Sequence, residues 1–123
     1  MLHGLRTVIY RVEDLGRAKG WYAGVLGKEP YFDEPFYVGF DVGGFELGLQ
    51  PDEDGAPRSS TGVVVYWGVD DAEAALARLL ELGASGRSGV QDVGEGILLA
   101  SVLDPFGNVF GIIENPHFSL EGA

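Results

Sequence analysis

Residues 5–15 read LRTVIYRVEDL, a β-rich run that ends in two acidic residues and a leucine. Asp14 is a good N-cap for a helix, and Gly27 can adopt the left-handed conformation that ends one. Between them, apolar residues recur at spacings of three and four, as on one face of a helix. These residues are Leu15, Ala18, Tyr22, Val25 and Leu26. The stretch therefore predicts a strand over 5–12 followed by a helix over 15–26.

The second half of the chain repeats this order of features. Residues 63–69 read VVVYWGV and predict a strand, Asp70 and Asp71 supply the cap, and Gly83 ends the helix. The apolar face of this second helix comprises Ala72, Ala75, Leu76, Leu79 and Leu80. The repeat indicates a single domain over 1–123 with two modules at about 4–51 and 61–116. Residues 52–60, rich in Asp, Gly, Pro and Ser, form the predicted linker.

Three short strands are predicted after each helix. A Gly43-Gly44 turn joins the last two in the first module, and the turn at 104–108 contains the Pro and Gly that a tight turn needs. The predicted strands cover residues 30–33, 36–42 and 45–50, and then 90–93, 97–103 and 109–114. Each module is thus predicted to be βαβββ, which makes the fold class α+β.

Composition excludes several classes of protein. The net charge of −11, from 19 acidic and 8 basic side chains, repels phosphate backbones, so we expect no nucleic-acid partner. The same charge would favour a cationic ligand, or it could act only on solubility. No apolar run approaches the ~18 residues that span a bilayer, no signal-peptide pattern is seen, and there is no cysteine. We therefore expect a cytoplasmic protein without a membrane partner, disulfides or thiolate metal sites.

Three motifs carry a resemblance to a known family. Val12-Glu13-Asp14-Leu15 leads into Trp21-Tyr22 and Val25-Leu26-Gly27, and Val69-Asp70-Asp71 leads into Leu82-Gly83-Ala84. Asp104-Pro105-Phe106-Gly107-Asn108 is followed by an apolar strand and Glu114. In this order the motifs resemble the vicinal-oxygen-chelate superfamily of glyoxalases, bleomycin-resistance proteins and extradiol dioxygenases. The resemblance implies two βαβββ modules forming a curved mixed sheet around a small-molecule cavity, and a homodimer.

The resemblance also implies where a metal would bind. Metal-using members place one ligand on the first and one on the fourth strand of each module, which corresponds here to Thr7, Glu46, Val64 and Gly111. Only Glu46 has a side chain suited to a divalent metal, so no metal or other cofactor is predicted. An unusual site that combines His3, Glu46 and His117 remains an open alternative.

Alternation along the strands predicts which side chains face the cavity. In 45–50 the apolar residues Phe45, Leu47 and Leu49 should pack beneath the helices, which leaves Glu46 and Gln50 on the other side. In 36–42 the same rule places Phe36, Val38, Phe40 and Val42 beneath the helices. The predicted ligand-binding set is Arg11, Tyr37, Asp41, Glu46, Gln50 and Tyr66. Each of these residues also has a structural alternative. Glu46 could be a solvated residue on an open strand face, and the tyrosines could pack against the sheet. Arg11 could form an ion pair with Glu13 or Asp14.

Two functions from different classes follow from these residues. The first is a metal-independent protein that sequesters a small organic ligand of cationic or aromatic character, as bleomycin-resistance members do. The second is a glyoxalase-like lyase or isomerase, or a dioxygenase-like enzyme, with a degenerate or unusual metal site. In that enzyme Glu46 would be catalytic, as a general base whose pKa is raised by a semi-apolar cavity. The identity of the ligand or substrate stays open.

Overall fold

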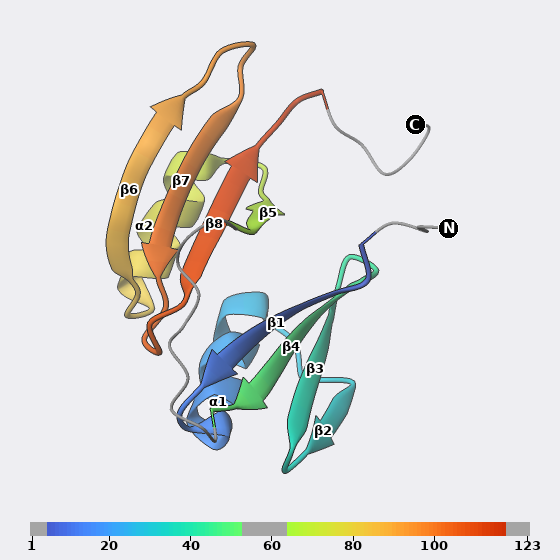
Figure 1. Cartoon of the computed structure of the whole chain (residues 1–123). Coiled ribbons are helices and arrows are strands. Elements are labelled where there is room, and N and C mark those ends of the chain that lie inside the picture. The colour runs from blue at the N-terminus through green and yellow to red at the C-terminus, as the bar shows by residue number, and fades with distance from the viewer. Residues whose placement is uncertain (1–4, 53–63, 118–123) are drawn as a thin grey trace. The chain divides into compact units, whose positions relative to one another are not determined.

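The computed structural model describes residues 5–52 and 64–117 and divides the chain into two compact units, Met1–Arg58 and Ser59–Ala123 (Figure 1). The first unit contains β1 (Thr7–Val12), α1 (Leu15–Leu26), β2 (Phe32–Glu34), β3 (Tyr37–Val42) and β4 (Phe45–Pro51). The second contains β5 (Tyr66–Gly68), α2 (Ala72–Glu81), β6 (Ser85–Asp92), β7 (Leu98–Leu103) and β8 (Val109–Glu114). Each unit is therefore a βαβββ module. The predicted linker at 52–60 lies, apart from Asp52, outside the described residues.

The two units have the same sheet topology. The strand order is β1-β4-β3-β2 in the first and β5-β8-β7-β6 in the second. In each, the first strand pairs in parallel with the last, and the remaining pairs are antiparallel. The duplicated order of elements predicted from the sequence is confirmed.

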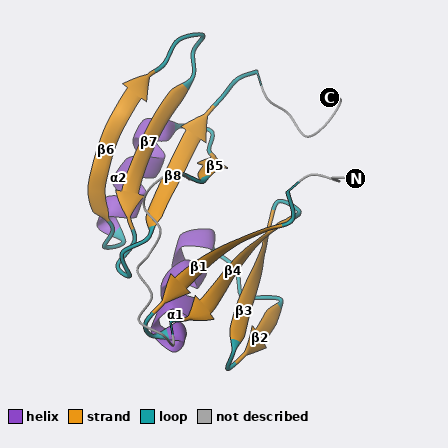
Figure 2. Ribbon diagram, viewed as in Figure 1, coloured by secondary structure: helices purple, strands orange, loops and turns teal. Residues whose placement is uncertain are grey.

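The core of the first unit lies between its sheet and α1 (Figure 2). The residues buried on this side alternate along the strands, as the pattern of apolar residues predicts. They are Tyr10, Val12, Val38, Phe40, Leu47 and Leu49, with Ala18 and Tyr22 from α1. The rings of Tyr10 and Tyr22 stack with their centroids 6.1 Å apart. The opposite side of the sheet, here called the helix-free face, carries the intervening residues of each strand.

The second unit packs α2 against its sheet in the same way. Leu79 of α2 is buried, as are Val102 of β7 and Ile112 of β8. The Ala72 N–H at the start of α2 donates to Glu114 Oε1 at the end of β8, at 2.8 Å. This hydrogen bond satisfies one of the unpaired N–H groups of the first helical turn and ties the helix to the sheet.

Both helices begin and end where the sequence predicts. Asp14 Oδ1 accepts from the Arg17 N–H, and Asp71 Oδ1 accepts from the Ala74 N–H, each at 3.0 Å. Gly27 has φ +68°, the left-handed conformation that costs other residues energy. These contacts fix the helix limits by capping.

The Asp104–Asn108 motif is a structural turn. Asp104 is buried, and its Oδ1 accepts from the N–H groups of Phe106 and Asn108 at 2.9 and 2.8 Å. The carboxylate therefore satisfies backbone donors inside the β7–β8 hairpin.

Three expectations about the strands are wrong. Strand β6 begins at Ser85 instead of residue 90, because this exposed edge strand is polar and glycine-rich and has no apolar alternation to signal it. Within the described part of the predicted 63–69, strand β5 covers only Tyr66–Gly68; residue 63 lies outside the described residues. Phe36 precedes β3 and is 64% exposed instead of packing beneath α1; its ring contacts Phe32. In the part of the chain that is described, no helix is long and apolar enough to cross a membrane.

Candidate functional site

The helix-free face of the first sheet brings three strands together around Glu46. On β4, Glu46 lies between Thr7 of β1 and Asp41 of β3, its partners in the two ladders. Directly paired residues project from the same face of a sheet. Two residues further along the strands, Gly39 and Gly48 form the next pair between β3 and β4 on that face.

The Glu46 carboxylate accepts hydrogen bonds from three hydroxyl groups. Thr7 Oγ1 and the Tyr37 hydroxyl each donate to Oε1, both at 2.7 Å. The Tyr31 hydroxyl donates to Oε2. The donors come from β1, from β3 and from the segment just before β2. Three separate parts of the first module therefore each place a hydroxyl group against the Glu46 carboxylate.

Two glycines make room for these side chains. A Cβ on Gly48 would lie 2.6 Å from Tyr37 Cζ, and a Cβ on Gly39 would lie 2.7 Å from Glu46 Oε2. The ring of Tyr31 would also be 3.3 Å from the Gly39 Cβ. Larger residues at either position would displace the groups that surround the carboxylate.

The hydroxyl donors keep Glu46 ionised. Hydrogen bonds from Tyr31, from Thr7 and, to a lesser extent, from Tyr37 lower the pKa of the Glu46 carboxyl below its ordinary value, against an opposing effect of burial. The hydrogen bond to Glu46 raises the pKa of the Tyr31 phenol, and burial together with Glu46 raises the pKa of Tyr37. The expectation of a raised Glu46 pKa is therefore wrong, because the sequence does not reveal the three donors. A carboxylate with a lowered pKa is a weaker proton acceptor, which disfavours the predicted role as general base.

The residues present do not fit the divalent metal that the family resemblance implies. Of the four expected positions, Thr7 is a hydroxyl that donates to Glu46, and the register places Tyr66 instead of Val64 across from Gly111. Val64 and Gly111 are therefore not ladder partners, as Thr7 and Glu46 are, and the ring of Tyr66 occupies the space that a Gly111 side chain would need, with Cδ1 2.7 Å from its Cβ position. A metal held by both oxygens of Glu46 would have to displace hydroxyls already bonded to Oε1, and the one acceptor position left on Oε2 gives a single ligand where a divalent site needs about three.

The alternative metal site with histidine is not assembled among the described residues. They contain no group of three or more His, Cys, Asp or Glu side chains that could hold a metal. His117 belongs to the second unit, where its Nε2 lies 2.7 Å from the Glu95 carbonyl oxygen. His3 lies outside the described residues.

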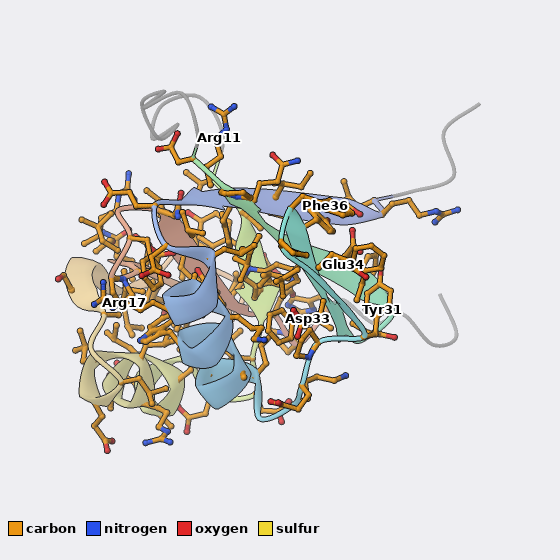
Figure 3. The ribbon with its side chains drawn as sticks, turned by 90° about the horizontal axis from the view of Figure 1, so that it is seen from below. Arg11, Arg17, Tyr31, Asp33, Glu34 and Phe36 are labelled. Atoms are coloured by element: carbon orange, nitrogen blue, oxygen red, sulfur yellow. The ribbon has the colours of Figure 1, made fainter. Side chains whose placement is uncertain are left out.

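The predicted ligand-binding residues fall into separate groups. Tyr37 and Glu46 are hydrogen-bonded, and Asp41 lies beside Glu46, but Asp41 Oδ1 accepts from the Gly44 N–H at 2.9 Å and so stabilises the β3–β4 turn. Arg11 of β1 and Gln50 of β4 are partners in the strand ladder. They lie four residues further along the strands than Glu46, which corresponds to about 13 Å. Figure 3 shows Arg11 well separated from Tyr31.

Tyr66, the sixth predicted residue, belongs to the second unit. It is 42% exposed and lines an open pocket of about 590 Å³ with Gly68, Val69, Asp70, Ile113 and Asn115. The described residues of the second sheet place no carboxylate at the register position that Glu46 occupies in the first, because Gly111 stands there.

Sequence reasoning missed Tyr31. This residue precedes β2, and strand alternation does not determine the direction of a side chain outside the strand. Thr7 was identified as a position at which a metal ligand is lost, and not as a hydrogen-bond donor to Glu46. Its place opposite Glu46 in the ladder gives the signal that could have identified it as a hydrogen-bond donor.

Comparison with protein families agrees with this architecture. Residues 4–112 match the model of the Glyoxalase/Bleomycin resistance protein/Dioxygenase superfamily. The chain belongs to this superfamily. Comparison with curated proteins gives no significant match.

Solved structures of superfamily members share the fold. A glyoxalase-related enzyme from Fulvimarina pelagi is 20% identical with a TM-score of 0.77, over 98% of this chain and 94% of that one. A superfamily member from Sphaerobacter thermophilus is 24% identical with a TM-score of 0.74, over 94% and 99% of the two chains. A lactoylglutathione lyase from Agrobacterium tumefaciens is 21% identical with a TM-score of 0.73, over 97% and 100%. At these identities the likeness establishes the α+β glyoxalase-like fold, and the function has to be argued from the site.

Proposed function

We propose that this superfamily member binds a small organic ligand at the helix-free face of its first sheet, without the usual divalent metal. The observation that carries the proposal is the set of three hydroxyl groups bonded to Glu46. A buried or half-buried carboxylate that is fixed by neighbouring donors is preorganised, so little conformational freedom is lost when a ligand binds.

The charge of this site favours a cationic ligand. The lowered pKa of Glu46 keeps its carboxylate negative at neutral pH, and the chain as a whole has a net charge of −11. A negative field raises the local concentration of cations. The aromatic rings of Tyr31 and Tyr37 beside the carboxylate add apolar contact area, as ligand sites commonly do.

The same observations weigh against the enzymatic alternative. A lyase, isomerase or dioxygenase built on this site would need either a proton acceptor or a metal. Glu46 is a weakened proton acceptor, and its hydroxyl neighbours fill both positions on Oε1 and one on Oε2, which leaves one position for a metal. Binding is therefore the function that the geometry supports best. As part of the proposal, the protein acts as a homodimer in the cytoplasm.

A titration of two forms of the protein tests the proposal. A screen of cationic and aromatic metabolites supplies the ligand, and calorimetry then compares the wild type with Glu46→Gln. The substitution keeps the shape and removes the charge, so a ligand that donates a hydrogen bond to Glu46 should lose a charge-assisted interaction of ~1.5–3 kcal/mol and bind about ten- to a hundredfold more weakly. A cation that donates no hydrogen bond should also bind more weakly, but by a smaller factor. Glu73→Gln, on an exposed position of α2, is the matched control and should leave the affinity unchanged. Equal affinities of wild type and Glu46→Gln would refute the site.

A further inference from the structure

We infer that the cationic group recognised at this site is an alkylated ammonium, quaternary or tertiary, in preference to a primary amine or a guanidinium. This inference rests on the proposed function and names its ligand class. It follows from two separate features of the helix-free face: the few acceptor positions left on Glu46 and the aromatic rings exposed beside it.

The hydrogen bonds already made by Glu46 limit what a ligand can add. An ionised carboxylate has about four lone-pair sites. Thr7 and Tyr37 fill two on Oε1, and Tyr31 fills one on Oε2. A single acceptor position on Oε2 therefore remains.

Ligands rich in N–H donors are poorly matched to a single acceptor position. A guanidinium pairs best through two parallel hydrogen bonds, one to each carboxylate oxygen, and here Oε1 already has two donors. A primary ammonium brings three donors, which would leave donors to be satisfied elsewhere. A quaternary ammonium has no N–H group, so it can use the charge of Glu46 without needing a free lone pair.

Aromatic side chains lie beside the carboxylate on the same face. Phe32 pairs with Gly39, and its ring meets those of Phe36 and Tyr37 edge to face, at 6.2 and 6.1 Å between centroids. Tyr37 and Tyr31 are both bonded to Glu46. The rings therefore form a connected group, Phe36–Phe32–Tyr37, that reaches the carboxylate.

These rings are available to a ligand in the first unit. Tyr31 and Phe36 are each 64% exposed, and Phe32 is 38% exposed. Figure 3 shows Tyr31 and Phe36 on the β2–β3 part of this unit, together with Glu34. Methylated ammonium groups bind to the faces of such rings through cation–π attraction, and they lose less hydration than a bare ammonium does.

The charges near the rings have the sign that a cation requires. Glu34 pairs with Tyr37 across β2 and β3, and Asp41 pairs with Glu46 across β3 and β4, so both project from the helix-free face. Lys28 partly offsets them, since its Nζ donates to the Asp41 carbonyl oxygen at 2.6 Å. Lys19 is paired with Asp33 at 2.8 Å. Three carboxylates, those of Glu34, Asp41 and Glu46, therefore lie on the same face as the aromatic rings.

Three matched probes test the inference: choline, ethanolamine, and 3,3-dimethylbutan-1-ol, the neutral isostere of choline. Binding is followed by the shifts of the Tyr and Phe ring signals in NMR titrations of the full chain. Choline should bind about two- to fivefold more tightly than ethanolamine, the range expected for cation–π attraction at an exposed site, and by at least that factor more tightly than the neutral alcohol, which also lacks the charge that Glu46 attracts. An equal or higher affinity for ethanolamine, an affinity for the neutral alcohol equal to that for choline, or no choline-dependent shift would each overturn the inference.

Two variants separate the contributions of lone pairs and rings. Tyr31→Phe keeps the ring and frees a second acceptor position on Oε2, so ethanolamine should gain affinity relative to choline. Phe36→Leu removes an exposed ring and should weaken choline more than ethanolamine. An unchanged ratio of the two affinities in both variants would overturn the inference.

The failure of this inference can be told apart from failure of the proposed function. If choline is not preferred but a screened ligand still depends on Glu46, the inference about alkylated ammonium fails and the binding site stands. If no screened ligand depends on Glu46, both fail together.

Discussion

At the scale of single residues, the state of Glu46 is decided by its hydrogen-bond donors. A carboxylate with three hydroxyl donors is stabilised as the anion, and this outweighs the effect of partial burial, which acts in the opposite direction. The pKa values of Tyr31 and Tyr37 shift in the opposite direction: they are raised, which keeps both phenols protonated. The site at neutral pH is thus one negative charge surrounded by neutral donors.

The pH dependence of stability follows from this lowered pKa. A carboxyl group whose pKa is lower in the folded than in the unfolded state stabilises the fold above its ordinary pKa, and this contribution is lost as the pH falls through the folded value. The difference in unfolding free energy between wild type and Glu46→Gln should therefore stay constant from about pH 7 to about pH 5 and decrease only below the ordinary value of 4.5. Urea unfolding at a series of pH values measures it. A difference that already decreases above pH 5 would show a raised pKa and contradict the assignment.

Sequence reasoning reached part of this site. Strand alternation selects Tyr37 and Glu46, because both lie inside regular strands whose apolar partners are buried. It cannot select Tyr31, which precedes its strand, and it cannot give the direction of the Glu46 pKa, which depends on that residue. Burial alone suggests a raised pKa, and only the positions of the donor atoms reverse it.

At the scale of secondary-structure elements, the pairing of β3 with β4 creates the space for the site. The cross-strand pair Gly39 and Gly48 lacks side chains at the point where Tyr37 and Glu46 lie. Glycine is usually unfavourable in a strand interior, and one accepted reason for its presence is close approach by another group. Here that group is a side chain of the same sheet.

Substitution of Gly48 by alanine tests this role. The added methyl group would overlap the Tyr37 ring, 2.6 Å from Cζ, so the ring must move and the hydrogen bond to Glu46 is weakened or lost. We expect a loss of about 1–3 kcal/mol in unfolding free energy, measured by chemical denaturation. Gly89→Ala is the control, because no atom lies within 4 Å of its Cβ position, and it should change stability by less than about 0.5 kcal/mol. Equal effects of the two substitutions would contradict the close packing of Tyr37 on Gly48.

Elements with strong local signals were predicted best. Both helices have an Asp N-cap and a glycine at or just after the C-cap, and β8 is apolar apart from Gly111 and its last residue, Glu114, so their limits were predicted correctly. Strand β6 was predicted too short, because its residues are mostly exposed on both sides and its pairing with β7 contains register shifts. Its pairing depends on β7, and local sequence does not encode it.

At the scale of the whole molecule, the chain is a duplicated module in which the two copies differ chemically. The repeated order of strand, cap, helix and hairpins was sufficient to predict the fold of both units. The copies diverge at equivalent ladder positions: Thr7 faces Glu46 in the first, and Tyr66 faces Gly111 in the second. The Glu46 site therefore belongs to the first module alone.

Exposed strand edges lead us to expect a homodimer. Strand β2 is at one edge of the first sheet and β6 is at one edge of the second, and both have mostly exposed residues. Unpaired edges favour association, and two-fold dimers are the commonest oligomers. Sedimentation equilibrium at micromolar concentration should give the mass of two chains. A single species with the mass of one chain would refute the dimer.

The most direct test of the central claim is the metal content of the protein. Hydroxyl groups fill most of the acceptor positions of Glu46, so no divalent ion should be bound there. Protein purified without chelator and dialysed against zinc, nickel, iron and manganese salts is analysed for its elements, beside Glu46→Gln. The account predicts much less than one metal ion per chain in both forms. Close to one ion per chain in the wild type, lost in Glu46→Gln, would contradict it.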